Sequence, residues 1–190
     1  MNSKLVFLDR DGVINALVAR DGRLLSPRLI EDFTIIPGVQ KAIEKLKWMG
    51  FEVVVVTNQP DISRGYLEPS LLHKMNLKVS ELGVNKVIVC AHSDEDNCEC
   101  RKPKPGMLEQ YIKSSEKKYS SIWMIGDQET DVIAGALVHA ITILISSDNR
   151  LNLETNARYV VTNLASAVEI ITEFTCNEQS KFLAKDTTQI

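Results

Sequence analysis

The sequence predicts an α/β fold in which a doubly wound, mostly parallel sheet has helices on both faces. Short apolar segments alternate along the chain with segments of helical periodicity, as in such sheets. The first strand, residues 5–8, is a continuous apolar run, which is typical of a parallel strand buried on both faces. Polar side chains follow several strands, and ligands of open α/β sheets bind outside the carboxyl ends of strands. One site at that edge is therefore expected.

The other elements follow in order from periodicity and turn residues. A helix is predicted over residues 39–49, where apolar residues recur at helical spacing and Gly50 follows as a C-cap. Residues 51–56 form a strand rich in β-branched side chains. Further strands are expected at 86–89, 122–125, 141–145 and, as a short edge strand, 159–161. Further helices are expected at 71–82, 107–117, 131–137 and from 164 onward. The expected sheet is thus of the Rossmann-like type.

Residues 12–37 interrupt this alternation with glycines, prolines and weak periodicity. We expect an irregular flap there, which could hold a hairpin and would overlie the site. The segments 15–39 and 65–86 leave little room for a large cap domain. The substrate is therefore expected in an open site formed by loops.

Composition and charge limit the class of protein. With 190 residues, 44% of them hydrophobic, the chain can form one domain with a sizeable core. We expect this domain over residues 1–175 and a flexible polar tail over 176–190. The net charge of −3 argues against nucleic-acid and anionic-membrane partners, and the apolar runs are too short to span a bilayer. No signal-peptide pattern follows Met1, so a cytoplasmic protein is expected. We also expect a monomer whose partner is a small-molecule sugar phosphate.

Two carboxylates, Asp9 and Asp11, follow the first strand two residues apart, and Gly12 then allows a sharp turn. In extended geometry both side chains face the same way. One carboxylate can attack phosphorus while the other protonates the leaving oxygen, and a divalent cation offsets their charge. The alternative is that these residues form only a strand-to-turn junction, because aspartate and glycine favour turns.

Four motifs occur in a fixed order along the chain. They are Asp9-Arg10-Asp11-Gly12-Val13-Ile14-Asn15, Val55-Val56-Thr57-Asn58-Gln59, Cys100-Arg101-Lys102-Pro103 and Gly126-Asp127-Gln128-Glu129-Thr130-Asp131. Together they resemble the motifs of the haloacid dehalogenase-like phosphatases. Within these, they are most similar to the branch that holds heptose bisphosphate phosphatases and histidinol-phosphatases. The resemblance runs from about residue 5 to residue 145.

The resemblance implies a magnesium-dependent phosphatase that works through a phosphorylated aspartate. Asp9 is the implied nucleophile and Asp11 the implied general acid and base, while Lys102 neutralises charge on the phosphoryl oxygens and on Asp9. The implied Mg²⁺ ligands are Asp127, the carboxylate of Asp9 and the backbone carbonyl of Asp11. Phosphoryl transfer chiefly needs positioning and cationic groups around the equatorial oxygens, which agrees with these roles. The alternative for Lys102 is an ordinary solvated lysine.

The resemblance also implies residues that bind the substrate. Thr57, with Asn58 beside it, would hydrogen-bond the phosphoryl group, and Arg101 would contact the substrate. Arg64, in an Ile-x-Arg-Gly run after the second motif, is also assigned to substrate binding. Pro60-Asp61 precede this run where the family has a small residue and a glycine, so we expect a loop of different shape.

Three cysteines and a histidine lie close together in residues 90–100: Cys90, His92, Cys98 and Cys100. Three thiolates and one imidazole form a closed tetrahedral set for Zn²⁺. The C-x-H and C-x-C spacing is uncommon among zinc motifs, but the same family branch carries such a loop, which implies a structural zinc. The alternative is an inert loop with chance cysteines.

The leading substrate implied by the resemblance is D-glycero-D-manno-heptose 1,7-bisphosphate, cleaved at its 7-phosphate in lipopolysaccharide or surface-heptose precursor synthesis. Histidinol phosphate, from histidine biosynthesis, stays open as an alternative, because it uses the same catalytic core. A non-catalytic binding relative also stays open, although both Asp9 and Asp11 are present. A 3′-phosphatase that repairs nucleic-acid ends is disfavoured because the chain has no basic stripe.

Overall fold

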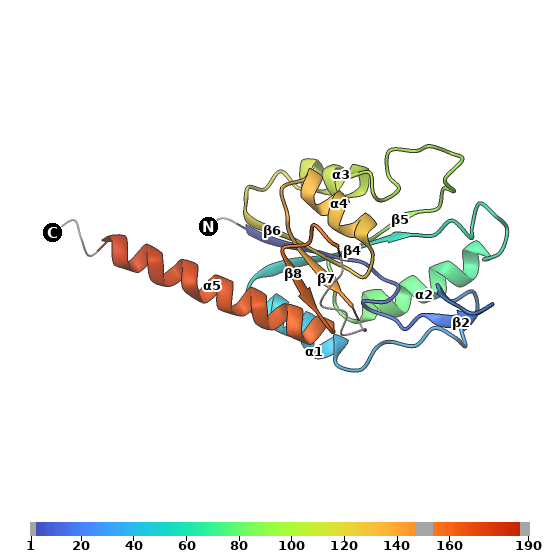
Figure 1. The fold of residues 1–190 in the computed structure, drawn as a ribbon, viewed down its shortest axis with the longest axis horizontal. Coiled ribbons are helices and arrows are strands. Elements are labelled where there is room, and N and C mark those ends of the chain that lie inside the picture. Colours follow the sequence, from blue (N-terminus) through green and yellow to red (C-terminus); the bar gives the residue numbers. More distant parts are fainter. Residues whose placement is uncertain (1–2, 147–153, 187–190) are drawn as a thin grey trace.

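The computed structural model describes residues 3–146 and 154–186, and these residues form the predicted α/β fold. Their central sheet has six strands in the order β5-β4-β1-β6-β7-β8, and every neighbouring pair is parallel (Figure 1). The strands are β1 (Ser3–Leu8), β4 (Phe51–Asn58), β5 (Lys86–Cys90), β6 (Tyr119–Gly126), β7 (Ile141–Ile145) and β8 (Tyr159–Val161). The strand order runs outward from β1 in both directions, which confirms the doubly wound sheet.

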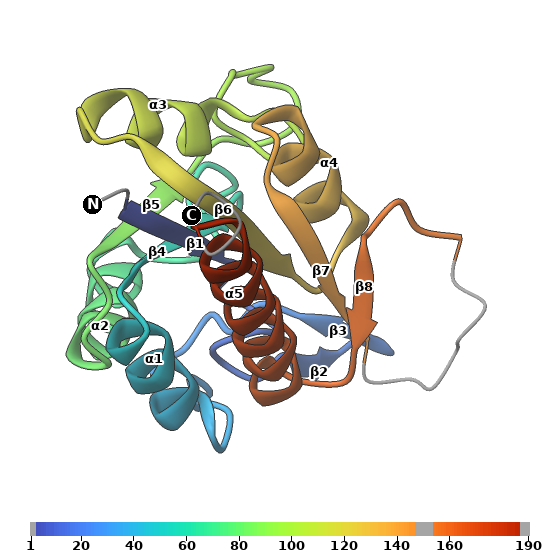
Figure 2. The same cartoon turned by 90° about the vertical axis from the view of Figure 1, so that its left-hand side faces the viewer.

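Helices cover both faces of the sheet (Figures 1 and 2). Side chains alternate between the faces of a strand, so successive residues of β1 and β4 enter two separate cores. One core joins Val6, Leu8, Val53 and Val55 to α1 (Val39–Trp48), α2 (Pro69–Glu81) and α5 (Leu164–Asp186). The other joins Leu5, Phe7, Val54 and Val56 to α3 (Gly106–Ser114) and α4 (Glu129–Leu137). Burial on both faces explains the apolar runs in these strands.

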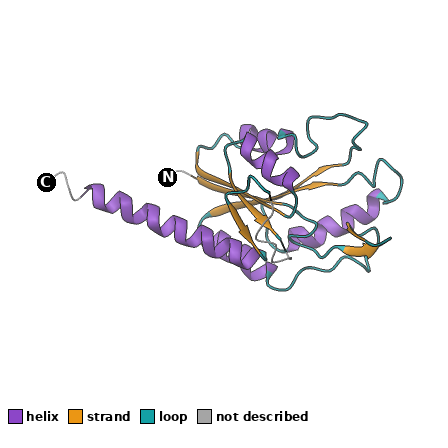
Figure 3. Cartoon of the chain, viewed as in Figure 1, coloured by secondary structure: helices purple, strands orange, loops and turns teal. Residues whose placement is uncertain are grey.

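The flap, residues 12–37, contains a hairpin, which the sequence suggested as one possibility. Strands β2 (Val18–Arg20) and β3 (Arg23–Leu25) pair antiparallel and form a small sheet of their own (Figure 3). The hairpin lies at the carboxyl end of the main sheet, as do the loops that follow β4 and β5 (Figure 1). Within the described residues no large cap domain is present, as expected.

Two element boundaries differ from the sequence expectation by three residues, more than the others. The helix expected over 107–117 ends at Ser114, and Glu116 adopts a φ of 54°, which is incompatible with a continuing helix. Strand β6 begins at Tyr119, earlier than expected, because its polar first residues pair with Ser3 and Lys4 of β1. The first difference reflects a local backbone conformation and the second a strand pairing, and hydrophobic periodicity shows neither.

Helix α5 extends beyond the body of the molecule at its C-terminal end (Figure 1). Its first half is anchored by Phe174, whose ring meets that of the buried Trp123 edge-on at 5.2 Å. The tail predicted from residue 176 begins inside α5, whose backbone continues to Asp186, and residues 187–190 lie outside the described residues. The flexibility of that tail stays a prediction. None of the helices in the described ranges is long and apolar enough to cross a membrane.

Candidate active site

Three adjacent strands, β4, β1 and β6, deliver the predicted catalytic residues to one cavity of about 280 Å³. Asp9 follows β1, Thr57 and Asn58 end β4, and Asp127 follows β6. The loop after the cysteine cluster brings Lys102 to the same place. The cavity is lined by Asp9, Asp11, Thr57, Asn58, Lys102 and Asp127, together with residues of the flap and of α4. The expected convergence at the carboxyl ends of the strands is therefore observed.

Lys102 lies buried between two carboxylates. Its Nζ is 2.5 Å from Asp9 Oδ1 and 2.6 Å from Asp131 Oδ1, and it donates to the Val56 carbonyl at 3.0 Å. Lys102 is 3% exposed and Asp131 is 1% exposed, so the solvated-lysine alternative is wrong. Asp131 lies in the fourth motif, but the sequence prediction gives it no role. Its place in the first turn of α4, four residues after Asp127, was the available signal.

Buried charge shifts the pKa values of the site. Burial raises the pKa of Asp9 well above its usual range, and the Lys102 ammonium opposes this shift only in part. Burial, and then the nearby Asp131 carboxylate, raises the pKa of Asp127 to about 6. Burial lowers the pKa of Lys102, but the Asp131 and Asp9 carboxylates outweigh it, and the net shift is upward. Lys102 is thus a permanent cation among carboxylates that need further positive charge to stay ionised.

Two glycines allow the backbone to approach these carboxylates closely. Gly12 has a φ of +85°, and a Cβ there would lie 2.3 Å from Asp127 Oδ2. A Cβ at Gly126 would lie 2.2 Å from the Asp131 side chain. Both distances are far below contact distance, so the first and fourth motifs require glycine at these positions to assemble the site.

The acidic groups suit a magnesium ion. Carboxylate oxygens of Asp9, Asp127 and Asp131 lie within 4.8 Å of one another, and oxygen is the ligand that Mg²⁺ prefers. Asp131 already binds Lys102 through Oδ1 and accepts the Gln128 backbone N–H at 3.1 Å through Oδ2. The carboxylates of Asp9 and Asp127 are bound less completely than that of Asp131 and keep more oxygen lone pairs for a metal ion. The sequence prediction names these two residues as Mg²⁺ ligands.

Asp11 is held by three donors. Its Oδ1 accepts from Arg10 Nη2 at 3.0 Å and from Asn15 Nδ2 at 2.9 Å, and its Oδ2 accepts from Gln59 Nε2 at 2.6 Å. Gln59 Nε2 also lies 2.8 Å from Thr57 Oγ1. Arg10, Asn15 and Gln59 are each no more than 1% exposed. The sequence prediction gives these three residues no role, although all of them lie in the first two motifs.

Asn58 fixes the position of Lys102, the lysine expected to take part in catalysis. Its Nδ2 donates to the Lys102 carbonyl at 2.9 Å, and its Oδ1 accepts the Lys102 backbone N–H at 3.1 Å. This pair of hydrogen bonds joins the end of β4 to the third motif. Asn58 therefore positions Lys102 in addition to lining the cavity.

The cysteine cluster has the geometry of a zinc site. Sulfur atoms of Cys90, Cys98 and Cys100 lie 3.3–3.6 Å apart, and His92 Nδ1 is 3.6 Å from Cys90 Sγ and 3.3 Å from Cys100 Sγ. Bonds of about 2.3 Å around a tetrahedral zinc place two sulfurs roughly 3.8 Å apart, which is close to these values. The donor set fits Zn²⁺, and His92 would bind through Nδ1.

The two predicted substrate arginines lie outside the catalytic cavity. Arg101 Nε donates to Asp94 Oδ1 at 2.7 Å, and Arg64 Nη2 lies 3.4 Å from Asp94 Oδ2. Arg101 lines a cavity of about 150 Å³ beside the cysteine cluster, and Arg64 lines one of about 240 Å³ beside the flap. Their roles in substrate binding stay predictions.

Comparison with known proteins agrees with this geometry. The family model of the haloacid dehalogenase-like hydrolases matches residues 6–139. The chain belongs to this family. The D-glycero-β-D-manno-heptose-1,7-bisphosphate 7-phosphatase of Pseudomonas aeruginosa is 35% identical to this hydrolase over 153 residues, covering 77% of this chain and 83% of that protein. The enzyme of the same name from Pasteurella multocida is 33% identical over 184 residues, covering 88% and 96%.

A solved structure is also similar to this hydrolase. The D,D-heptose 1,7-bisphosphate phosphatase from B. bronchiseptica, complexed with magnesium and phosphate, superposes with a TM-score of 0.76 at 27% identity. The alignment covers 90% of this chain and 98% of that one. The predicted membership of the family is therefore confirmed.

Proposed function

We propose that this hydrolase is a magnesium-dependent phosphatase that removes the 7-phosphate of D-glycero-D-manno-heptose 1,7-bisphosphate. The observation that carries the proposal is the buried Lys102 between Asp9 and Asp131, at the edge of a cavity that holds further carboxylates. The similar enzymes of known name support the choice of substrate, and their names specify the β-anomer. The β-anomer is therefore the first to test.

The chemistry divides into two displacements at phosphorus. In the first, the free carboxylate oxygen of Asp9 attacks, the bond from phosphorus to the C7 oxygen breaks, and Asp11 gives a proton to that oxygen. In the second, Asp11 takes a proton from a water molecule, which attacks the aspartyl-phosphate and releases inorganic phosphate. Lys102 would lower the energy of the charge that develops on the phosphoryl oxygens, and Thr57, which lines the cavity, would hydrogen-bond them.

Two metals accompany this proposal. Asp9, Asp127 and the Asp11 carbonyl would hold Mg²⁺, which supplies positive charge to the phosphoryl group and offsets that of the carboxylates. Zn²⁺ at the cysteine cluster would be structural, because protein atoms fill all four positions. Holding Cys100 would fix Arg101 and Lys102 at the edge of the cavity.

The proposed setting is a cytoplasmic monomer that acts in surface-heptose synthesis. In the described residues the six-stranded sheet has a hydrophobic core on each face, which supports a domain that folds alone. Size-exclusion chromatography with light scattering tests the monomer, and a stable dimer in solution would rule it out.

A phosphate-release assay tests the function. The panel holds both anomers of heptose 1,7-bisphosphate, histidinol phosphate and common sugar phosphates, each with Mg²⁺ and with Asp9→Asn as the control. We expect a strong preference for a heptose bisphosphate that disappears in Asp9→Asn. A preference for histidinol phosphate would keep the chemistry and change the pathway. Equal release by the wild type and Asp9→Asn would show that the chain is a non-catalytic relative.

A further inference from the structure

Gln59 lies behind the catalytic cavity and contacts two of the side chains that line it. Its Nε2 donates to Asp11 Oδ2 at 2.6 Å and to Thr57 Oγ1 at 2.8 Å. Gln59 is 1% exposed and does not line the catalytic cavity, whereas Asp11 and Thr57 do. Any effect of Gln59 on a reaction in this cavity therefore passes through these two side chains.

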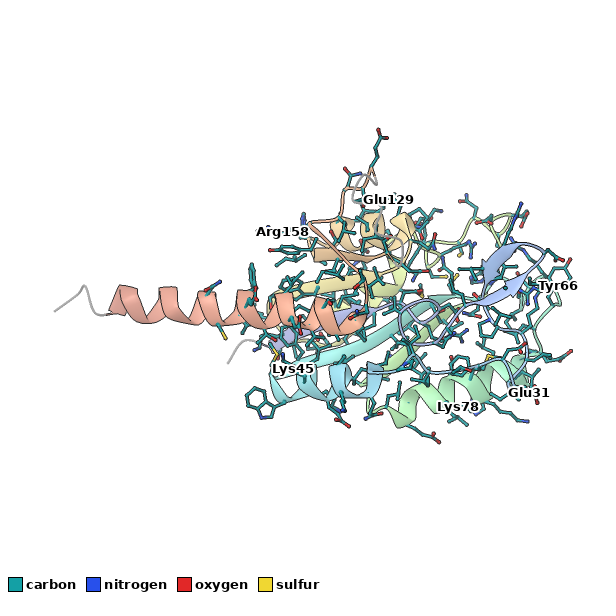
Figure 4. The ribbon with its side chains drawn as sticks, turned by 60° about the horizontal axis from the view of Figure 1, so that its bottom comes forward. Glu31, Lys45, Tyr66, Lys78, Glu129 and Arg158 are labelled. Carbon is teal, nitrogen blue, oxygen red and sulfur yellow. The ribbon has the colours of Figure 1, made fainter. Side chains whose placement is uncertain are left out.

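The backbone fixes Gln59 at this position. The residue directly follows β4, and its N–H donates to the carbonyl of Cys90, at the end of the neighbouring strand β5, at 2.7 Å. The loop that begins at Gln59 leads to Tyr66, which lies beside the hairpin (Figure 4). Because the backbone is tied to the end of a strand, the amide group is held at a defined point between Thr57 and Asp11.

The Asp11 carboxylate determines which way the Gln59 amide faces. An amide has two N–H donors on its nitrogen and only an acceptor on its oxygen. If the amide were turned over, its oxygen would face a carboxylate oxygen, and two acceptors repel. Asp11 also accepts from Arg10 Nη2 at 3.0 Å and from Asn15 Nδ2 at 2.9 Å, so its surroundings are those of an ionised carboxylate. Both hydrogens of Gln59 Nε2 are thus used, one by Asp11 and one by Thr57.

This orientation decides the direction of the Thr57 hydroxyl. Its oxygen accepts a hydrogen bond from Gln59, so its own hydrogen must point to a different acceptor. Within the described ranges the hydroxyl has no other hydrogen-bond partner, and Thr57 lines the catalytic cavity. The hydroxyl hydrogen is therefore left for a phosphoryl oxygen.

Gln59 also acts on the proton transfer. In the first displacement, Asp11 gives its proton to the leaving oxygen and becomes a carboxylate. A hydrogen bond to a carboxylate is stronger than one to a neutral acid, so the bond from Gln59 strengthens as the proton leaves. The contact at 2.6 Å therefore favours protonation of the leaving oxygen.

We propose that Gln59 is a positioning residue for phosphoryl transfer. Its one amide nitrogen directs the Thr57 hydroxyl hydrogen to the phosphoryl group and stabilises Asp11 as this residue protonates the leaving oxygen. The inference rests on the proposed function, because it takes Asp11 as the general acid and Thr57 as a ligand of the phosphoryl group. It needs no particular sugar and holds for any alkyl phosphate that this hydrolase cleaves.

Two substrates with different leaving groups separate the two contributions. p-Nitrophenolate leaves without taking up a proton, whereas the alkoxide of a sugar phosphate must be protonated as it leaves. Gln59→Met keeps the length of the side chain and removes both donors. It should lower kcat/KM about tenfold for p-nitrophenyl phosphate, where only the bond to Thr57 matters, and about a hundredfold for heptose 1,7-bisphosphate, where both bonds matter.

A loss of stability alone gives a different result. The control Val79→Ala removes two buried carbon atoms from the core under α2, away from the cavity, so it should lower Tm and change neither value of kcat/KM. Equal losses for both substrates in Gln59→Met, or no loss for either, would overturn the inference. If Gln59→Met does not fold, Gln59→Asn carries the same test, because its amide is too short to reach both Asp11 and Thr57.

Failure of the proposed function has a separate signature. If heptose 1,7-bisphosphate is not cleaved, the comparison uses the alkyl phosphate that the wild type cleaves fastest, and Gln59 is tested in the same way. If the wild type cleaves no phosphate ester, calorimetry with Mg²⁺ and inorganic phosphate decides. Binding that is severalfold weaker in Gln59→Met than in the wild type supports the role of Gln59 in directing Thr57, and equal binding overturns it.

Discussion

Replacing Lys102 by methionine should destabilise this hydrolase strongly when Mg²⁺ is absent. Methionine has a similar length and fills the same volume, so the change removes the charge and leaves the packing nearly intact. Asp9 and Asp131 then lose the cation 2.5 Å and 2.6 Å away, and the Val56 carbonyl loses a donor. Removing one partner of a buried ion pair costs about 3–5 kcal/mol, because the other charge is left uncompensated.

For a domain of this size, that loss lowers Tm by roughly 10 °C. The penalty should shrink as pH falls, since without Lys102 the buried carboxylates take up protons at higher pH and lose their charge. The double variant Lys102→Met/Asp131→Asn removes one of the unpaired charges. It should therefore recover at least about 1 kcal/mol of the free energy of unfolding, which is the coupling expected for groups in contact.

Urea denaturation in EDTA at pH 7.5 and pH 5 measures these differences, with Lys113→Met as the control. Lys113 forms an exposed pair with Glu109 at 2.9 Å, and such pairs contribute less than about 1 kcal/mol. A loss in Lys102→Met as small as that in Lys113→Met would refute the reasoning. So would a double variant that is no more stable than Lys102→Met. Neither variant at position 102 should retain more than about a thousandth of kcat.

Three further changes test other parts of the site. Gly12→Ala should abolish most of the phosphatase activity, because the new Cβ would overlap Asp127. Gly22 also has a positive φ, +72°, but has open space around it, so Gly22→Ala should lower only the stability, through backbone strain. Phosphate release and Tm distinguish the two effects. Metal analysis should find one zinc ion per chain. Cys98→Ser should lose this zinc and have a lower Tm, whereas the control Cys176→Ser should keep it. A wild-type protein that is stable without zinc would contradict the zinc site. The pKa of Asp127 is raised to about 6, so below pH 6 Mg²⁺ must displace a proton from this carboxyl group. The affinity for Mg²⁺ should therefore fall about tenfold per pH unit below pH 6. Calorimetric titrations that give the same Kd for Mg²⁺ at pH 5 and pH 7.5 would exclude this linkage.

The parallel sheet was predictable because its strands are buried on both faces. Residues 5–8 and 51–56 are largely apolar, and each segment lies in a strand that extends two residues beyond it at one end. The start of β6 was not predictable, since Tyr119 and Ser120 are polar and join the sheet only by pairing beside β1. The early end of α3 depends on the backbone of Glu116, which hydrophobic periodicity does not report.

The positions of Asp9 and Asp127 could be predicted from the sequence because each follows directly after a strand. Asp9 and Asp127 lie after neighbouring strands, so their proximity follows once the sheet is known. The spacing of Asp131 after Asp127 was a signal for a role in the site, but its contact with Lys102 depends on the approach of a helix turn to a lysine that is distant in sequence. Arg10 was missed for a similar reason: a charged residue at a strand end suggests exposure, yet it is buried against Asp11 and Asn76.

Trapping of phosphorylated Asp9 tests the central claim most directly. The wild-type protein is mixed with Mg²⁺ and heptose 1,7-bisphosphate, quenched in acid within a single turnover, digested and examined by mass spectrometry. We predict one added phosphoryl group on the peptide that contains Asp9, and none in Asp9→Asn. Rapid release of phosphate with no phosphorylated peptide at any quench time, or with the group on another residue, would contradict the account.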